Sequence, residues 1–152
     1  MRRLAESGPE MTQIDFYTHV GNKLHVACRL AAKAYSQRLR VAVLCPDAAT
    51  AQHFDRMLWT APALGFVPHC PADHPLAART PIVVDHKGVA LPHDEVLLNL
   101  REEWPAVFSR FQRLIEIVSE EDADRSSARA RFKFYRDRGY DIRSHDLSKT
   151  ES

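Results

Sequence analysis

The chain has 152 residues, and 21 Lys and Arg face 20 Asp and Glu, so the formal net charge is only +1. Apolar side chains make up 45% of the sequence and charged ones 27%, which is ordinary for a soluble globular protein and excludes a largely disordered chain. The small net charge also excludes a generally basic surface, so any attraction to a polyanion has to come from a local patch.

Cysteine usage suggests a cytoplasmic protein, and the sequence suggests one domain with a short segment at each end. Cys28, Cys45 and Cys70 form an odd set without CxxC spacing, which argues against a disulfide framework and favours a reducing cytoplasm. No stretch approaches the ~20 apolar residues of a transmembrane helix, so we expect no membrane association. We expect a flexible leader over residues 1–10, a domain over 11–143 and a flexible tail over 144–152.

The first half of the chain alternates expected strands and helices. Residues 14–17, IDFY, are β-branched and aromatic and predict a strand, and apolar residues then recur at helical spacing over 24–35. The continuous apolar run 41–45 predicts a strand buried on both faces. Asp47 is placed to cap a second helix over 48–59.

The second half continues the alternation after a loop that is rich in proline and histidine. Residues 82–85, 95–100 and 113–118 predict three more strands, and WPAVFSRF between the last two predicts a short helix with Pro105 in its first turn. Ser119 is the expected N-cap of a closing helix. Strands alternating with helices over this length predict a single three-layer α/β domain with a mostly parallel sheet of about five strands.

Candidate catalytic and cofactor-binding residues are few. The turn THVGNKLH has one glycine where a dinucleotide fingerprint needs three, and no phosphate-binding GxxxxGK loop occurs. His69, Cys70, Asp73 and His74 form one cluster rather than the separated pairs typical of zinc sites, and Cys45 has no neighbouring base that would form a thiolate. We therefore expect a binding or assembly protein without catalytic residues, cofactor or metal.

The stretch RSSARARFKFYRDRGY, residues 125–140, combines six cations with four aromatic rings. At about 100° per residue, one stripe of a helix collects cations and one ring: Arg125, Arg129, Phe132, Lys133 and Arg136. Ala128 and Tyr135 lie to one side and are the better core candidates.

Three interpretations of this stripe stay open. It is the solvated face of a terminal helix, or a site for single-stranded nucleic acid with rings that stack on bases, or a site for a short acidic peptide. Such a peptide would end in an aromatic residue and a free carboxylate, which need only the cations and the one pocket that a single helix can display. The narrow stripe and the acids at 120–124 argue against a long nucleic-acid strand.

Four segments occur in a fixed order: MTQIDFY at 11–17, LW at Leu58 and Trp59, FVPH at 66–69, and the closing RARFKFYRDRGY. Together they resemble the chi subunits of the bacterial DNA polymerase III holoenzyme, from Met11 to about Ile142. The resemblance implies a Rossmann-like fold that lacks nucleotide binding. It also implies a non-enzymatic accessory protein that links the clamp loader to single-stranded-DNA-binding protein, and through it to single-stranded DNA.

The resemblance further implies which residues bind. Chi subunits hold the acidic C-terminal tail of single-stranded-DNA-binding protein, which ends in Pro-Phe, on their last helix. Carried over to this chain, the tail site falls on Arg125, Arg129, Phe132 and Lys133, with Val118 nearby. We also include Arg136 of the same stripe in this site. The family often has Lys and Tyr where this chain has Arg125 and Phe132. Arginine keeps the charge, whereas phenylalanine loses one possible hydrogen bond.

A second surface in the family receives the psi subunit, which tethers chi to the clamp loader. We place this surface around an aromatic and proline-rich segment: Trp59, Pro62, Phe66, Val67 and Pro68. Aromatic residues and prolines in a loop suit a protein interface, although core packing under a long loop would use the same residues.

Overall fold

A computed structural model describes residues 11–60 and 65–148. The described residues form one α/β domain whose seven strands make a single sheet in the order β3-β4-β2-β5-β6-β1-β7. All neighbouring strands in this sheet are parallel. The predicted α/β domain with a mostly parallel sheet is confirmed, but the expected count of about five strands is wrong.

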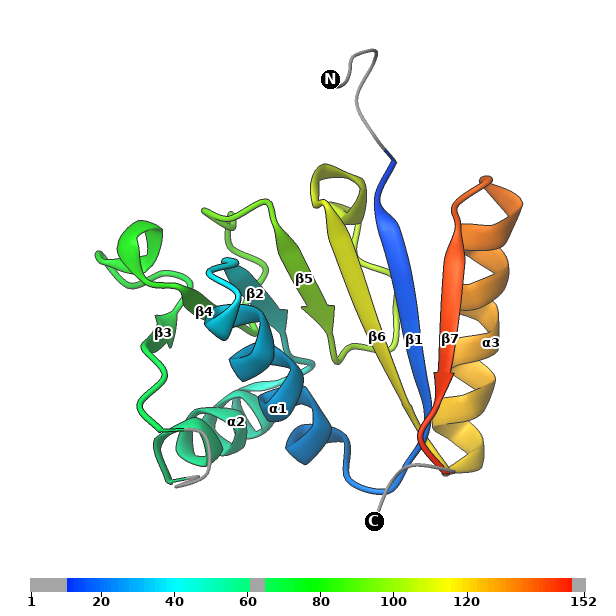
Figure 1. The fold of residues 1–152 in the computed structure, drawn as a ribbon, viewed down its shortest axis with the longest axis horizontal. Coiled ribbons are helices and arrows are strands. Elements are labelled where there is room, and N and C mark those ends of the chain that lie inside the picture. Colours follow the sequence, from blue (N-terminus) through cyan, green and yellow to red (C-terminus); the bar gives the residue numbers. More distant parts are fainter. Residues whose placement is uncertain (1–10, 61–64, 149–152) are drawn as a thin grey trace.

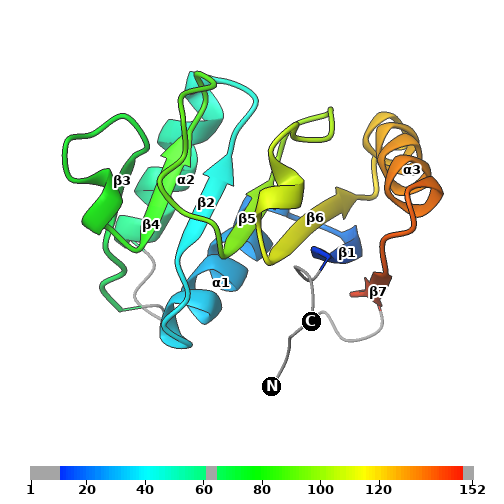
Figure 2. The same cartoon turned by 90° about the horizontal axis from the view of Figure 1, so that it is seen from above.

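The strands are β1 (Gln13–Val20), β2 (Val41–Leu44), β3 (His69–Pro71), β4 (Ile82–Asp85), β5 (Val96–Asn99), β6 (Arg113–Ser119) and β7 (Ile142–Asp146). The helices are α1 (Lys23–Ser36), α2 (Ala48–Thr60) and α3 (Asp122–Asp137), with short 3-10 turns at Ala77–Arg79 and Phe108–Arg110. Figure 1 shows β3 and β7 at the two edges of the sheet, and Figure 2 shows how strongly the strands twist between them.

The two additional strands are both edge strands. β3 has three residues and ends at a proline, and β7 has the mostly polar sequence IRSHD. Neither shows the apolar run of a buried strand, because each pairs on one side only, β3 with β4 and β7 with β1. β7 includes residues 144–146 of the expected flexible tail, so an ordered element extends into that tail. Residues 1–10 and 149–152 lie outside the described residues.

Two local expectations about helices are wrong. Residues 104–111 form only a 3-10 turn, because Phe108 and Phe111, three residues apart, are both buried and the Thr12 hydroxyl donates to the Phe111 carbonyl at 2.6 Å. Ser119 does not cap α3, because β6 continues through it and the helix has Glu121 as its N-cap residue. The expected cap of α2 is confirmed, since the Asp47 carboxylate accepts from the Thr50 amide at 2.8 Å.

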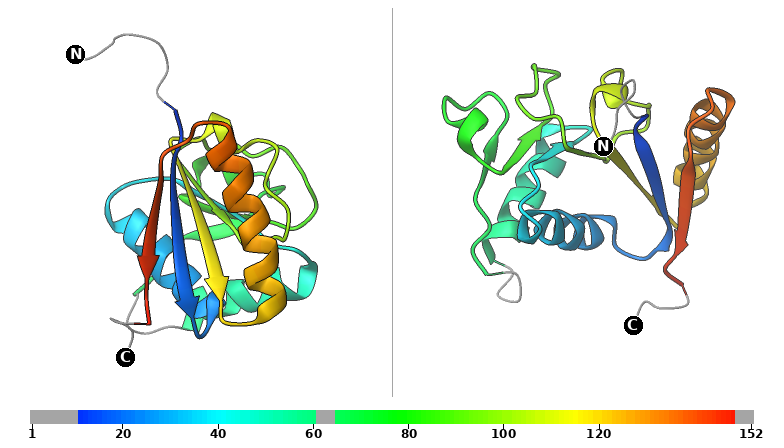
Figure 3. Two further views of the ribbon diagram at one scale, coloured as in Figure 1. Left: turned by 90° about the vertical axis from the view of Figure 1, so that its right-hand side faces the viewer. Right: turned by 45° about the horizontal axis from the view of Figure 1, so that its top comes forward.

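The helices form layers on both sides of the sheet. One cluster of buried residues joins α1 and α2 to one face, and a second cluster joins α3 and the Phe108 turn to the other. The views in Figure 3 show α3 beside β6, β1 and β7, with α1 and α2 across the sheet from it. The alternation of β1 explains part of this arrangement, because Ile14 and Phe16 point to the α3 face.

A buried polar network fastens α3 to the sheet. Glu116 of β6 is 0% exposed, and its carboxylate accepts from Arg131 Nε at 2.9 Å, from the Tyr135 hydroxyl at 2.7 Å and from Asn99 Nδ2 at 3.1 Å. Arg131 Nη1 also donates to the Glu102 carbonyl at 2.8 Å. The network thus ties α3 to β5, β6 and the loop after β5.

The chemistry of this network makes its members interdependent. Burial raises the pKa of the Glu116 carboxyl, and the positive charge of Arg131 opposes that rise. Burial beside Glu116 also raises the pKa of the Tyr135 hydroxyl, which therefore stays a proton donor. Removing one partner would leave a buried charge without compensation.

We expect the substitution Arg131→Met to lower the free energy of unfolding by about 3–5 kcal/mol, because Glu116 would remain buried without its cation. Chemical denaturation measures this loss. Lys133→Met is the matched control on the same helix, because its side chain is 67% exposed, and it should cost less than about 0.5 kcal/mol. Equal midpoints for the two variants would show that the network does not anchor α3.

Candidate functional site

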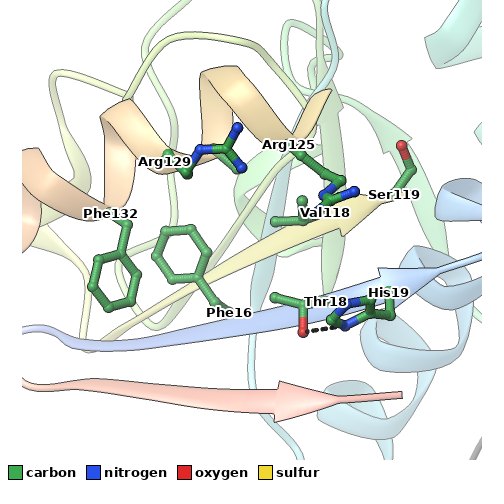
Figure 4. A pocket seen from close by; sticks show the side chains of 9 residues that line it. Phe16, Thr18, His19, Val118, Ser119, Arg125, Arg129 and Phe132 are labelled. Atoms are coloured by element: carbon green, nitrogen blue, oxygen red, sulfur yellow. Dashed lines mark hydrogen bonds between the residues drawn. The ribbon is translucent and has the colours of Figure 1, made fainter. Parts of the chain in front are cut away.

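A pocket of about 210 Å³ lies between the first half of α3 and the carboxyl ends of β1 and β6. Figure 4 shows it from close by. Its lining consists of Phe16, Thr18, His19, Val118, Ser119, Arg125, Ala128, Arg129 and Phe132. Throughout, we call this site the α3 groove.

One end of the α3 groove is aromatic. Phe16 is 2% exposed and forms part of the floor, and the ring of Phe132 packs edge-on against it with the two centroids 5.3 Å apart. Val118 and Ala128 are also buried and continue the apolar floor. Because Phe132 is only partly buried, its ring offers an exposed apolar surface beside this floor.

The other end of the α3 groove carries positive charge. Arg125 and Arg129 are one helical turn apart, and in Figure 4 the Arg125 guanidinium lies near Ser119, away from the two phenylalanine rings. Arg125 Nη1 is 3.9 Å from the exposed Asp122 carboxylate. Arg129 makes no hydrogen bond or ion pair to any residue within 11–60 or 65–148, so its guanidinium is available to an anion.

Acidic residues at the start of α3 are partly neutralised within the fold. The Asp124 carboxylate accepts from the Ser119 amide at 2.7 Å and from Lys23 Nζ at 3.1 Å. Burial would raise the pKa of Asp124, but these two donors together hold it below its ordinary value. This carboxylate therefore pins the start of α3 to the end of β6 and to α1.

Strand β1 contributes an unusual rim. His19 has a positive φ of 58°, and the register of β1 against β6 shifts between Tyr17 and Val20. Its Nδ1 lies 3.1 Å from Asp146 Oδ1 on β7 and 3.3 Å from Thr18 Oγ1. The rim of the groove therefore carries an exposed imidazole held between two strands.

The structure brings together four of the six residues that the sequence placed in this site: Val118, Arg125, Arg129 and Phe132. Lys133 and Arg136 are not part of the lining. Both are exposed, and their side chains pair with Asp137 at 2.7 Å and 3.5 Å. Lys133 is rotated outward from Phe132 by about 100°, and Arg136 follows Phe132 by about one turn along the axis.

Sequence reasoning missed the contributions from the sheet, namely Phe16, Thr18, His19 and Ser119, together with Ala128 as part of the floor. The alternation of IDFY places Phe16 on a face of the sheet, but nothing local indicates that this face meets α3. The single signal for His19 is its position two residues before Gly21, near the end of the strand.

The second predicted surface is divided. Trp59 is 59% exposed and Phe66 67% exposed, and their ring centroids are 5.6 Å apart. Val67 is only 1% exposed and packs in the core under α1 and α2, so its side chain is not part of a surface. Pro68 is partly buried, and Pro62 lies outside the described residues. Trp59 and Phe66 thus form an exposed aromatic pair, which we call the α2 aromatic pair.

The remaining chemical candidates are engaged within the fold. His69 lies between the Val67 carbonyl at 2.7 Å and Asp55 Oδ1 at 3.0 Å, and Asp73 pairs with Lys87. Within 11–60 and 65–148, no group of three or more His, Cys, Asp or Glu side chains is arranged to hold a metal ion. Burial raises the pKa of the Cys45 thiol to about 12. No helix in the described ranges is long and apolar enough to cross a membrane.

Comparison with known proteins gives a consistent result. A sequence model of the family described as DNA polymerase III chi subunit, HolC, matches residues 11–143. The chain is 37% identical over 146 residues to the DNA polymerase III subunit chi of Pseudomonas aeruginosa, which covers 91% of this chain and 99% of that protein. The subunit chi of Haemophilus influenzae is 30% identical, and the match covers 80% of this chain and 85% of that protein. The subunit chi of Escherichia coli is 29% identical, and the match covers 77% of this chain and 80% of that protein.

Proposed function

This chain belongs to the DNA polymerase III chi subunit family, and on that premise we propose that it is a non-catalytic accessory subunit that links the clamp loader to single-stranded-DNA-binding protein. The α3 groove would hold the acidic C-terminal tail of that protein, which ends in Pro-Phe. The observation that carries the proposal is the combination, in one groove, of an aromatic end and a cationic end.

The aromatic end suits the side chain of a terminal phenylalanine. Phe132 packs against Phe16 by its edge, an arrangement that a third ring can extend. A phenylalanine moved from water into this corner would gain roughly 1.5–3 kcal/mol if it became fully buried.

The cationic end suits carboxylates. Arg129 is the cation of the groove that makes no bond to another described residue, and a guanidinium binds a carboxylate through two parallel hydrogen bonds. We assign Arg129 to the terminal carboxylate of the tail and Arg125 to an acidic side chain.

The expected affinity is moderate, and the ring has to supply much of it. A short peptide site of this kind would have micromolar affinity, about −8 kcal/mol. Exposed ion pairs contribute only ~0.2–1 kcal/mol each, so the two groove arginines alone could not reach that value. Lys133 and Arg136 share Asp137 as a partner, and we assign them a role in attracting the acidic tail rather than in holding it.

The α2 aromatic pair is proposed as the surface that receives the psi subunit. Two large rings that are more than half exposed are costly in water and are typical anchors of protein interfaces. The pair belongs to α2 and the segment before β3, whereas the groove belongs to α3, β1 and β6 (Figure 1). Two separate surfaces would allow one chain to hold two partners at the same time.

We expect Arg129→Ala to weaken binding of a synthetic acidic tail peptide by about 1 kcal/mol, because the ion pair of an exposed arginine with the terminal carboxylate is lost. Titration calorimetry measures this change. Arg136→Ala is the matched control, since Arg136 is a cation of the same helix outside the groove. Its expected loss is below about 0.5 kcal/mol. Equal losses for both variants would mean that only the general charge of α3 attracts the peptide.

We expect Trp59→Ala to weaken binding of the organism's psi subunit by about 2 kcal/mol or more, as for a central aromatic anchor, and to leave tail-peptide binding unchanged. Trp104→Ala is the control, since Trp104 is also exposed but stacks on Phe134 of α3. A psi affinity that responds equally to both substitutions, or to neither, would remove the α2 aromatic pair from the proposal.

A further inference from the structure

His19 occupies a backbone conformation that its residue type seldom adopts. With φ at 58° it lies in the left-handed region, which is uncommon for residues other than glycine and tends to persist where surrounding contacts impose it. The conformation occurs at the shift in β1 register. As a result, His19 reaches the rim of the α3 groove while Val20 stays buried in the core.

The contacts of His19 fix which ring nitrogen is left for a ligand. Nδ1 lies 3.1 Å from a carboxylate oxygen of Asp146, and a carboxylate can only accept, so Nδ1 carries the proton of this contact. In the neutral ring, Nε2 is then an unprotonated acceptor. Nε2 makes no bond to any other residue in the described ranges, and the side chain is 47% exposed.

We propose that His19 is a third ligand-binding cation of the α3 groove. An acidic, carboxylate-terminated peptide then binds more tightly when the imidazole of His19 is protonated. This inference rests on the proposed function of the groove. A neutral His19 would present a lone pair at Nε2 to an anion, whereas a protonated ring presents an N–H donor and a positive charge. Imidazole is the side chain whose ordinary titration falls near neutral pH.

Charged side chains from three elements surround the groove near His19. Asp146 of β7 places a negative charge beside the ring, and Arg125 and Arg129 of α3 place positive charges at the other side of the groove. Lys23 at the start of α1 and Asp124 in the first turn of α3 form an ion pair with each other. An anion bound in the groove would therefore lie between the two arginines and the imidazole of His19.

The test is the pH dependence of peptide binding to the full-length protein. We expect the dissociation constant of a short acidic peptide ending in Pro-Phe to be about three- to fivefold smaller at pH 6 than at pH 8, as for one partly exposed ion pair. The carboxylates of the peptide stay ionised over this range. In His19→Asn, which tolerates a left-handed backbone, the affinity should be nearly independent of pH.

His53→Asn, an exposed histidine of α2, is the matched control and should keep the full pH dependence. Calorimetry in buffers of different ionisation enthalpy should also show proton uptake on binding in the wild type and none in His19→Asn. Tight binding without pH dependence, or pH dependence that persists in His19→Asn, would overturn the role of His19 and leave the proposed function standing. An absence of peptide binding at both pH values would overturn the proposed function and the role of His19 with it.

Discussion

The placement of α3 depends on one buried ion pair, between Glu116 of the central region of the sheet and Arg131 of the helix. Its two side chains are at most 2% exposed and 2.9 Å apart, and Tyr135 and Asn99 satisfy the remaining oxygen of Glu116. Because a buried carboxylate is costly without its partners, helix rotations that break the pair are disfavoured. The pair thereby fixes which face of α3 packs against the sheet.

That fixed rotation creates the α3 groove. Arg131 and Tyr135 point into the sheet. The neighbouring face of the helix, which carries Arg129 and Phe132, therefore lies at the border between core and solvent. Phe132 meets Phe16 there, while Arg129 extends into the groove without a partner among the described residues. The α2 aromatic pair depends on a different cluster of the core, under α1 and α2. Mutations at one surface should therefore leave the other intact, as the proposed linking role requires.

Much of this arrangement could be predicted from the sequence, but not its sheet-derived half. Helical spacing alone grouped Arg125, Arg129 and Phe132, and it selected Ala128 and Tyr135 for the core, which is confirmed. The same spacing could not show that Arg136 lies beyond the end of the groove, because that depends on where the strands stop. Phe16 and His19 come from a strand distant in sequence, and β7 shows no apolar pattern because one edge-strand partner is enough to order it.

The central claim is that the α3 groove recognises a terminal aromatic ring together with negative charge, rather than charge alone. Titration calorimetry of the full-length protein with the acidic tail peptide, and with the same peptide lacking only its last phenylalanine, tests this directly. Both peptides keep a free carboxylate and the same acidic residues. We expect the shortened peptide to bind roughly 2 kcal/mol or more weakly, about 30-fold. Equal affinity for the two peptides would contradict a ring-binding groove.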